Sequence, residues 1–211
     1  MKISDIRLQY EKGSLNEHTV GDEPLVFFEK WLHESINAAV QEPTAMMLST
    51  CDSYGRPSSR VVLLKGLADN KLHFFTNYLS LKGNQIDSNN QVALLFFWPE
   101  LERQVRFVGV ATKVSERDSD EYFNSRPIES RVGAVISPQS QAIGDRSELE
   151  AAYNKLIESP DIDSLKRPEH WGGYAVTITE AEFWQGRPGR LHDRIRFRNE
   201  NNTWVKERLA P

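Results

Sequence analysis

A series of five short apolar or alternating runs between residues 44 and 115 constrains the fold more than any other feature of the chain. Turn signals such as DSYGRP and ADN separate several of them. Alternation with a period of two in short runs predicts β-strands, and strands this close in sequence predict a barrel or a sandwich. The runs are TAMMLSTC, SSRVVLLKG, KLHFFTN, QVALLFFWP and RQVRFVGVATKVS.

Helical patterns flank these strands. Pro24 suits a first helical position, and apolar residues follow it at three- and four-residue steps until a stop near Pro43, which predicts an amphipathic helix. Its inward positions would be Leu25, Phe28, Leu32, Ile36 and Ala39. Residues 117–124 and 145–158 predict two more helices; GYAVTITEAEFWQG, RIRFR and TWVKERL predict strands, with NENN as a hairpin turn. The sequence therefore predicts a mainly β fold with added helices, of the α+β class.

Composition narrows the function classes. The formal net charge of −4 argues against a general nucleic-acid binder, because such domains are usually basic. The apolar run at 92–98 is far shorter than the roughly 20 residues of a spanning helix, so no membrane anchor is expected. The single cysteine, Cys51, cannot form an intramolecular disulfide, and the charged N-terminus is unlike a secretory signal, so we expect a cytoplasmic protein. No linker divides the chain, which indicates one domain.

Arginines concentrate in FWQGRPGRLHDRIRFR, residues 183–198, which holds five of them and one aspartate. A nucleic-acid backbone, a membrane surface, an acidic protein face and the phosphate of a small molecule are the anions to consider. A small phosphate needs only a few cations, which suits an acidic chain. Within the stretch, GRPGRLHDR forms a tight loop that would present Arg190 and His192 together, although such a histidine is more often merely hydrogen-bonded.

Three other islands combine cations with hydroxyl groups. Ser80 is a good N-cap whose helix would aim backbone N–H groups and Lys82 at one point, as in a phosphate site, or it caps an ordinary helix with a solvated lysine. Tyr122, Arg126 and Ser130 would share a face if one helix ran through Pro127, or would converge if one helix ended and another began there. The alternative for both groups is that they are ordinary surface polar residues, as most residues of these types are.

In RVVLLK, Arg60 and Lys65 are five residues apart, so in a regular strand their side chains would point to opposite faces of the sheet. They can share a site only if the strand ends or bulges between them. The alternative is two surface charges that flank a buried strand. The chain shows no Rossmann or P-loop glycine motif, no Cys/His cluster for a metal and no hydrolase signature.

The stretch EFWQGRPGRLHDR, together with RVVLLKG, ERQV, YFNSRP and RLAP, closely resembles the pyridoxine/pyridoxamine 5′-phosphate oxidase family. The similarity runs from about residue 7 to the end of the chain, and the Arg-Leu-His-Asp-Arg core is specific to that family. The resemblance implies a split β-barrel that works as a homodimer with FMN at the subunit interface. Residues 21–211 would form the FMN-binding domain, and residues 1–20 a segment that can cover the site.

The resemblance also implies roles for individual residues. The FMN contacts it implies are Arg60, Val61, Val62, Leu63, Leu64, Lys65, Phe75, Thr76, Lys82, Gln104, Gln139, Ser140, Trp184 and Arg194. For the substrate, it implies a 5′-phosphate site of Lys65, Tyr122, Arg126 and Ser130, a covering pair of Arg7 and Tyr10, and a catalytic pair, Arg190 and His192, at the pyridine ring. Relatives commonly carry a basic residue where this chain has Leu81, which puts the FMN affinity in doubt.

The implied reaction is the oxidation of pyridoxine or pyridoxamine 5′-phosphate by oxygen to pyridoxal 5′-phosphate. It releases hydrogen peroxide, and ammonia from the amine, in vitamin B6 cofactor biosynthesis and salvage. Another split-barrel flavin reductase or a non-catalytic FMN carrier would need the flavin residues but not the substrate residues. A nucleic-acid-binding module would bind in a strongly salt-dependent way and would not be yellow.

Overall fold

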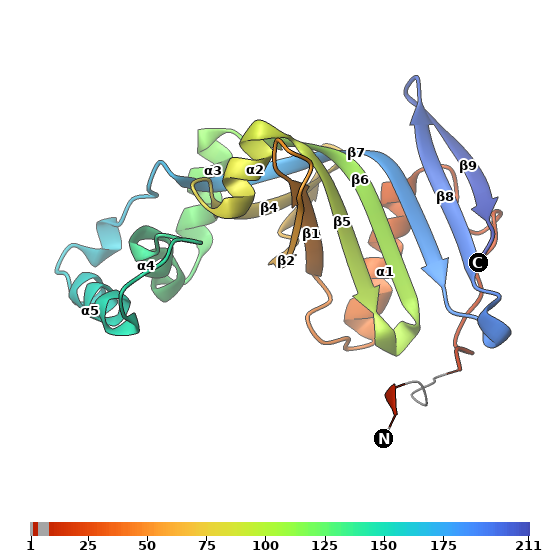
Figure 1. Ribbon diagram of the computed structural model, residues 1–211, viewed down its shortest axis with the longest axis horizontal. Helices are drawn as coiled ribbons and strands as arrows, with labels where there is room; N and C mark the ends of the chain where they lie inside the picture. The colour runs from red at the N-terminus through yellow and green to blue at the C-terminus, as the bar shows by residue number, and fades with distance from the viewer. Residues whose placement is uncertain (1, 4–8) are drawn as a thin grey trace.

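The computed structural model of the chain describes residues 2–3 and 9–211. In this part of the chain, one antiparallel sheet of nine strands has the order β2-β1-β5-β6-β7-β4-β3, and β8 and β9 continue it beside β7 (Figure 1). The strands are β1 (Ala45–Cys51), β2 (Pro57–Leu63), β3 (Gly66–Ala68), β4 (Lys71–Asn77), β5 (Gln91–Trp98), β6 (Arg103–Lys113), β7 (Trp171–Gln185), β8 (Asp193–Glu200) and β9 (Thr203–Leu209). All the predicted strands but one are confirmed as single strands.

The run SSRVVLLKG departs from the prediction, because it forms two strands rather than one. β2 ends at Leu63, and β3 starts at Gly66 to pair with β4. Between them the backbone N–H of Lys65 donates to the carbonyl of His73 at 2.8 Å, so the chain changes its partner from β1 to β4. A strand therefore ends between Arg60 and Lys65, so the two side chains need not point to opposite faces of the sheet.

The long strand β7 curls the sheet because its two halves have different partners. Its first half pairs with β4 and its second half with β8, while β6 follows it along the other side. The β6–β7 register shifts between Val108 and Gly109. A β-bulge of this kind bends a strand and increases its twist. A Cβ at Gly109 would lie 2.4 Å from the carbonyl oxygen of Thr177, so only glycine fits there.

Helix α1 (Pro24–Asn37) covers the core face of β5, β6 and β7. Phe28 packs against Phe96 and Phe107, with ring centroids 4.8 and 5.0 Å apart, and Phe27 packs against Phe183 at 4.9 Å. The helix is confirmed, but part of its predicted inward face is wrong. The helix ends at Asn37 rather than near Pro43, so Ala39 lies beyond it, and the side chain of Ile36 is exposed, while Phe27, Trp31 and Ser35 are buried. Both sets have helical spacing, and the larger aromatic residues take the core because they remove more apolar area from water.

The other α-helices are α2 (Leu81–Ser88), α3 (Glu116–Ser125), α4 (Ile128–Ile136) and α5 (Arg146–Ile157), and short 3₁₀ turns are η2 (Pro99–Leu101), η3 (Ile162–Ser164) and η4 (Pro188–Arg190). Figure 1 shows α4 and α5 beyond one end of the sheet and the β8–β9 hairpin at the other. The predicted NENN turn is confirmed, with positive φ at Asn201 and Asn202. No helix among residues 2–3 and 9–211 is both long and apolar enough to cross a bilayer.

Candidate functional site

Lys82 lies at the centre of a buried polar cluster at the start of α2. Ser80 caps this helix, as predicted, by accepting a hydrogen bond from the N–H of Gly83 at 3.3 Å. Only 8% of Lys82 is exposed, and its ammonium donates to Gln139 Oε1 at 2.9 Å, Thr76 Oγ1 at 3.2 Å and Ser80 Oγ at 3.3 Å. In the described part of the chain no carboxylate pairs with this ammonium, so the buried charge has only neutral oxygens around it.

Arg60 adds a second cation to this cluster. Its guanidinium donates to Thr50 Oγ1 at 2.6 Å and to Gln85 Oε1 at 3.3 Å, from the strand beside α2. Burial and the charge of Arg60 lower the pKa of Lys82 to about 8, and burial also lowers the pKa of Arg60. A buried lysine beside a half-buried arginine favours the binding of an anion, and a phosphate at a helix N-terminus fits this geometry. The residues present therefore fit the phosphate of FMN.

A second group of predicted residues meets at the start of β7. The ring of Tyr122 stacks on Phe75 with centroids 3.8 Å apart, and the guanidinium of Arg126 lies 4.7 Å from the ring centroid of Trp171. Burial lowers the pKa of Arg126, and its Nη1 is buried without a hydrogen-bond partner in the described chain. Since α3 ends at Ser125, Arg126 is extended and α4 begins at Ile128, the helix break that was one of the two predicted alternatives is present.

The remaining members of the predicted phosphate set are less tightly joined. Ser130 is half-buried in the first turn of α4, and Lys65 is exposed between β2 and β3. Neither side chain forms a hydrogen bond within residues 2–3 and 9–211. The unpartnered guanidinium nitrogen of Arg126, next to Tyr122, is nevertheless a donor that a second phosphate could use.

Gln104, Trp184 and Arg194 form one row across three strands. Gln104 of β6 lies opposite Trp184 of β7, and Trp184 lies opposite Arg194 of β8, so all three side chains share the outer face of the sheet. Arg194 is held by Glu182 at 2.9 Å and by the carbonyl of Ala210 at 2.9 Å. The three predicted flavin contacts are therefore brought together, and the charge of Arg194 is already balanced.

Tyr10 and His192 cover one end of this row. The ring of Tyr10 lies edge-on to Trp184, with centroids 5.6 Å apart, and the ring of His192 lies 4.7 Å from that of Trp184. His192 Nδ1 accepts the backbone N–H of Arg187 at 3.1 Å, which fixes the imidazole at the mouth of the loop. The predicted partner of Tyr10, Arg7, lies outside the described residues.

The arginine stretch is mostly neutralised within the chain itself. Arg187 approaches Asp193 at 3.5 Å, Arg194 binds Glu182, and Arg196 and Arg198 share Glu207 at 2.6 and 3.1 Å. Among the described residues, Arg190 has no such carboxylate, and it is exposed with a φ of 62° at the end of η4. Most of these arginines therefore form ion pairs within the part of the sheet made by β7, β8 and β9. Arg190 is the one that remains available to bind a ligand.

The two ends of β7 keep these groups apart. Trp171, beside Arg126, is the first residue of β7, and Arg190 lies in the 3₁₀ turn that follows its last residue, Gln185. A strand of 15 residues spans roughly 45 Å at about 3.3 Å per residue. One small ligand cannot touch both ends of β7 in the same chain, as the separation of α3 from the β7–β8 turn in Figure 1 illustrates.

The other predicted flavin residues lie along β2 and the loop after α4. Val61 and Leu63 are exposed, while Val62 is half-buried and Leu64 is buried. Ser140 is exposed with a φ of 71°, beside Gln139.

Sequence reasoning missed Trp171 and Gln85. Trp171 stacks near Tyr122, with ring centroids 6.2 Å apart, and the two following glycines permit this approach, because a Cβ at Gly173 would lie 2.7 Å from the Phe75 ring. The WGG triplet at a strand start was the available signal. Gln85 had no signal, because its contacts with Arg60 and Thr50 bring together residues distant in sequence.

The curled antiparallel sheet and its buried cationic cluster define the class of the FMN-binding split β-barrels. Two family models cover most of the chain: "Pyridoxamine 5′-phosphate oxidase" over residues 32–158 and "Pyridoxine 5′-phosphate oxidase C-terminal dimerisation region" over residues 171–211. The chain belongs to the pyridoxine/pyridoxamine 5′-phosphate oxidase family, and it is an enzyme of the oxidoreductase class.

Individual relatives agree with this assignment. A pyridoxine/pyridoxamine 5′-phosphate oxidase of Actinobacillus succinogenes is 53% identical over 211 residues, which cover 100% of both chains. One of Haemophilus influenzae is 49% identical with the same coverage. Among solved structures, PhzG from Burkholderia lata, in complex with tetrahydrophenazine-1-carboxylic acid, has a TM-score of 0.86 and 29% identity, covering 93% of this chain and 98% of that one. An FMN-binding protein of Nostoc punctiforme has a TM-score of 0.74 and 18% identity, covering 94% and 100%, and supports the fold.

Proposed function

We propose that this chain is an FMN-dependent oxidase that converts pyridoxine 5′-phosphate or pyridoxamine 5′-phosphate to pyridoxal 5′-phosphate. Oxygen would accept the electrons and leave as hydrogen peroxide, and the amine substrate would also release ammonia. The observation that carries the proposal is the presence of two separate cationic sites, one around Lys82 and one around Arg126. A phosphorylated cofactor and a phosphorylated substrate need one each.

FMN held by Lys82 and Arg60 would supply the redox chemistry, as the acceptor of a hydride from the substrate and the donor of electrons to oxygen. The chain supplies charge and position. Lys82 and Arg60 neutralise the cofactor phosphate, while Arg126 and Tyr122, with Lys65 and Ser130, hold the substrate phosphate. Anchoring the phosphate fixes the pyridine ring relative to the loop that carries Arg190 and His192. Such positioning accelerates a reaction because the entropy of alignment is lost on binding rather than in the transition state.

His192 orients the substrate in this proposal. Because its Nδ1 accepts the N–H of Arg187, the neutral ring carries its proton on Nε2 and can donate it to an acceptor on the substrate. This contact favours an orienting donor over a general base. Arg190, which has no carboxylate partner in the described chain, would lie against the pyridine ring.

The homodimer follows from the distance between the ends of β7. We propose that the Lys82 and Arg126 clusters of one protomer face the Gln104–Trp184–Arg194 row, Arg190 and His192 of its partner, with FMN between the two subunits. Exposed apolar side chains on the outer face of the sheet support this arrangement: Val61, Met47 and Phe97 are 64%, 41% and 52% exposed, and a second copy would cover them.

The N-terminal segment would cover the completed site, and residues 21–211 would form the single FMN-binding domain. Tyr10 already lies against Trp184 and His192, and the backbone N–H groups of Glu11 and Lys12 donate to one carboxylate oxygen of Glu102 at 2.8 and 2.9 Å. Further along the segment, Leu15 is buried in the core, and Arg208 binds the carboxylate of Glu17 and the carbonyl of Leu15, so this part of the cover is fixed to the sheet. The single cysteine, Cys51, suits a reducing cytoplasm as the site of the reaction.

Anaerobic reduction of the bound flavin tests the proposal. Pyridoxine 5′-phosphate added to the FMN-reconstituted protein without oxygen should bleach the visible flavin band, and unphosphorylated pyridoxine at the same concentration should bleach it far more slowly. Admission of air should then restore the band and yield pyridoxal 5′-phosphate. A protein that binds FMN but keeps its colour would contradict the proposed reaction, and would favour a flavin carrier or a reductase with another electron donor.

A further inference from the structure

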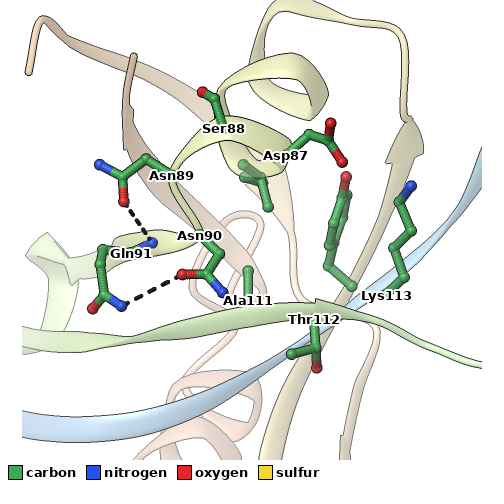
Figure 2. Close-up of a pocket in the computed structure, with 10 residues that line it drawn as sticks. Asp87, Ser88, Asn89, Asn90, Gln91, Ala111, Thr112 and Lys113 are labelled. Carbon is green, nitrogen blue, oxygen red and sulfur yellow. Dashed lines mark hydrogen bonds between the residues drawn. The ribbon is translucent and has the colours of Figure 1, made fainter. Parts of the chain in front are cut away.

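A cavity of about 690 Å³ lies at the C-terminal end of α2, next to the start of β5 and the end of β6 (Figure 2). Ile86, Ala111 and Tyr174 line it and are buried, at 3%, 3% and 2% exposure. Its other lining residues are polar and reach the surface: Asp87, Ser88, Asn89, Asn90, Gln91, Thr112 and Lys113. The cavity therefore combines an apolar floor with a polar rim, as small-molecule sites commonly do.

The hydroxyl of Tyr174 is the one side-chain group of this cavity that is buried without a hydrogen-bond partner in the described chain. Burial raises the pKa of Tyr174, and the nearby Tyr78 and the negative charge of Asp87 raise it further. A buried hydroxyl without a partner costs about 1–3 kcal/mol, so native proteins usually satisfy such groups with protein, water or ligand. Tyr174 is one of the residues that line the cavity, and a ligand that reaches its hydroxyl would satisfy it.

Two opposite charges lie at one end of the cavity. Figure 2 shows Asp87 and Lys113 at one end, and Asn89, Asn90 and Gln91 at the other. Lys113 Nζ lies 4.6 Å from the ring centroid of Tyr78, and within residues 2–3 and 9–211 neither charged side chain is in an ion pair. Since both side chains are exposed and unpaired there, each can move to meet a ligand group of opposite charge.

The side-chain amides of Asn89, Asn90 and Gln91, at the other end of the cavity, make only some of the hydrogen bonds that they can form. Asn89 Oδ1 accepts the backbone N–H of Gln91 at 3.2 Å, and Gln91 Nε2 donates to Asn90 Oδ1 at 3.5 Å. Both contacts are drawn in Figure 2. They leave the amide N–H groups of Asn89 and Asn90 and the Gln91 carbonyl for a polar ligand.

We propose that this cavity binds a small zwitterion, a free amino acid with a polar side chain. Its ammonium would bind Asp87, its carboxylate would bind Lys113 and the hydroxyl of Tyr174, and its side chain would meet the Asn89, Asn90 and Gln91 amides. A ligand with both charges is favoured because either charge alone would leave one of the two cavity charges unmatched.

The proposed site is separate from the flavin and substrate sites. None of the residues predicted for either of them lines this cavity. Lys82 lies in the first turn of α2 and Asp87 in the last, so the helix lies between the two sites. Binding in the cavity therefore needs neither the proposed oxidation nor the substrate, and the two proposals can fail independently.

Calorimetric titration of the FMN-loaded protein with L-glutamine tests this inference. The titration is made without oxygen and with pyridoxine 5′-phosphate present in excess, so that the substrate site is blocked and no heat of turnover is released. N-acetyl-L-glutamine lacks the ammonium and L-glutaminamide lacks the carboxylate. We expect saturable binding of L-glutamine and a loss on the order of tenfold or more for each derivative, because a charge-assisted hydrogen bond disappears. No saturable binding of L-glutamine, or equal binding of all three compounds, would overturn the proposal.

Variants locate the binding site. Asp87→Asn and Lys113→Met should each weaken the binding of L-glutamine on the order of tenfold, whereas the exposed controls Asp163→Asn and Lys155→Met should leave it unchanged. Tyr174→Phe should also weaken binding, while the melting temperature stays the same or rises because an unsatisfied buried hydroxyl has been removed. Unchanged binding in all three cavity variants would place the ligand elsewhere and overturn the proposal.

Discussion

The ammonium of Lys82 donates to Gln139 Oε1 at 2.9 Å, which joins the first turn of α2 to the loop that follows α4. Gln139 also accepts from Thr76 Oγ1 at 3.1 Å, so a single amide oxygen connects β4, α2 and this loop. A bound phosphate would compete for the same donors. The loop is therefore held beside the proposed cofactor site, although its sequence, SPQSQAIGDRS, is that of a polar loop.

The affinity for FMN should fall as the pH rises above 8. In the flavin-free protein, burial and Arg60 lower the pKa of Lys82 to about 8, so above that pH the amine must take up a proton to bind a phosphate. The dissociation constant should increase by up to about tenfold per pH unit. Fluorescence titrations at several pH values measure this slope. Lys82→Met should bind FMN weakly with little of this pH dependence, and an equal slope in that variant would exclude Lys82 as its source.

The same pKa shift has a consequence for stability with the opposite sign. Because the pKa of Lys82 is lowered from 10.5 to about 8, the unfolded chain binds more protons between these pH values. The contribution of Lys82 to the stability of the flavin-free protein should therefore increase as the pH rises through this interval. Urea unfolding of the wild type and of Lys82→Met, compared at pH 7.5 and 9.5, isolates this contribution: the difference between the two proteins should change with pH in favour of the wild type.

Leu81→Arg should tighten FMN binding. Leu81 is the first residue of α2, next to Lys82, and 53% of it is exposed, so an arginine there could reach the cofactor phosphate without entering the core. We expect a gain of about fivefold, because the new contact is charge-assisted but partly screened by water. Leu79→Arg adds the same charge at a side chain that is 57% exposed but lies outside the helix. If both variants gained equally, the effect would be one of net charge alone.

Arg190→Ala should reduce turnover far more than FMN binding. Arg190 lies on an exposed turn, and no carboxylate of the described chain binds it, so its removal leaves the sheet intact. We expect kcat/KM for pyridoxine 5′-phosphate to fall on the order of 100-fold, with the FMN dissociation constant changed less than about twofold. Arg198→Ala, which removes an arginine paired with Glu207, is the matched control. Loss of FMN with unchanged turnover after reconstitution would refute this role for Arg190.

Two glycines should respond in opposite directions to alanine. A Cβ at Gly83 would lie 2.0 Å from the carbonyl oxygen of Tyr78, so Gly83→Ala should displace the first turn of α2, lower the melting temperature and weaken FMN binding. A Cβ at Gly133 in α4 meets nothing within 4 Å, so Gly133→Ala should stabilise the protein by about 0.5–1 kcal/mol. Thermal unfolding of the two variants decides between these outcomes. Equal melting temperatures would show that α2 can shift without cost.

Local patterns predicted most of the elements because each pattern has a local cause. Alternation predicted β1, β4, β5 and β6, and Ser80 predicted the start of α2 through its own side chain. The inward face of α1 was only partly predicted, since two faces have helical spacing and the partners Phe96, Phe107 and Phe183 decide between them. The break after Leu63 could not be read either, because it depends on a hydrogen bond from Lys65 to His73 on another strand.

Only those parts of the candidate site that depend on residues close in sequence could be predicted. The cap at Ser80 and the loop that carries Arg190 and His192 are local motifs, and the structure forms both. The carboxylates that neutralise the arginine stretch could not be assigned, because Glu182 and Glu207 are brought to Arg194 and Arg196 by strand register. The excess of positive charge that the stretch shows in the sequence is therefore largely cancelled by the fold.

Subunit complementation tests the central claim most directly: that one site uses the Arg126 cluster of one protomer and Arg190 of its partner. Arg126→Ala and Arg190→Ala are each made as homodimers with little activity, then mixed under conditions that exchange subunits. In a mixed dimer one site carries both substitutions and the other carries neither, so random pairing should restore roughly a quarter of the wild-type activity. Mixed dimers that form, as shown by differently sized tags, but remain as inactive as their parents would contradict the shared site.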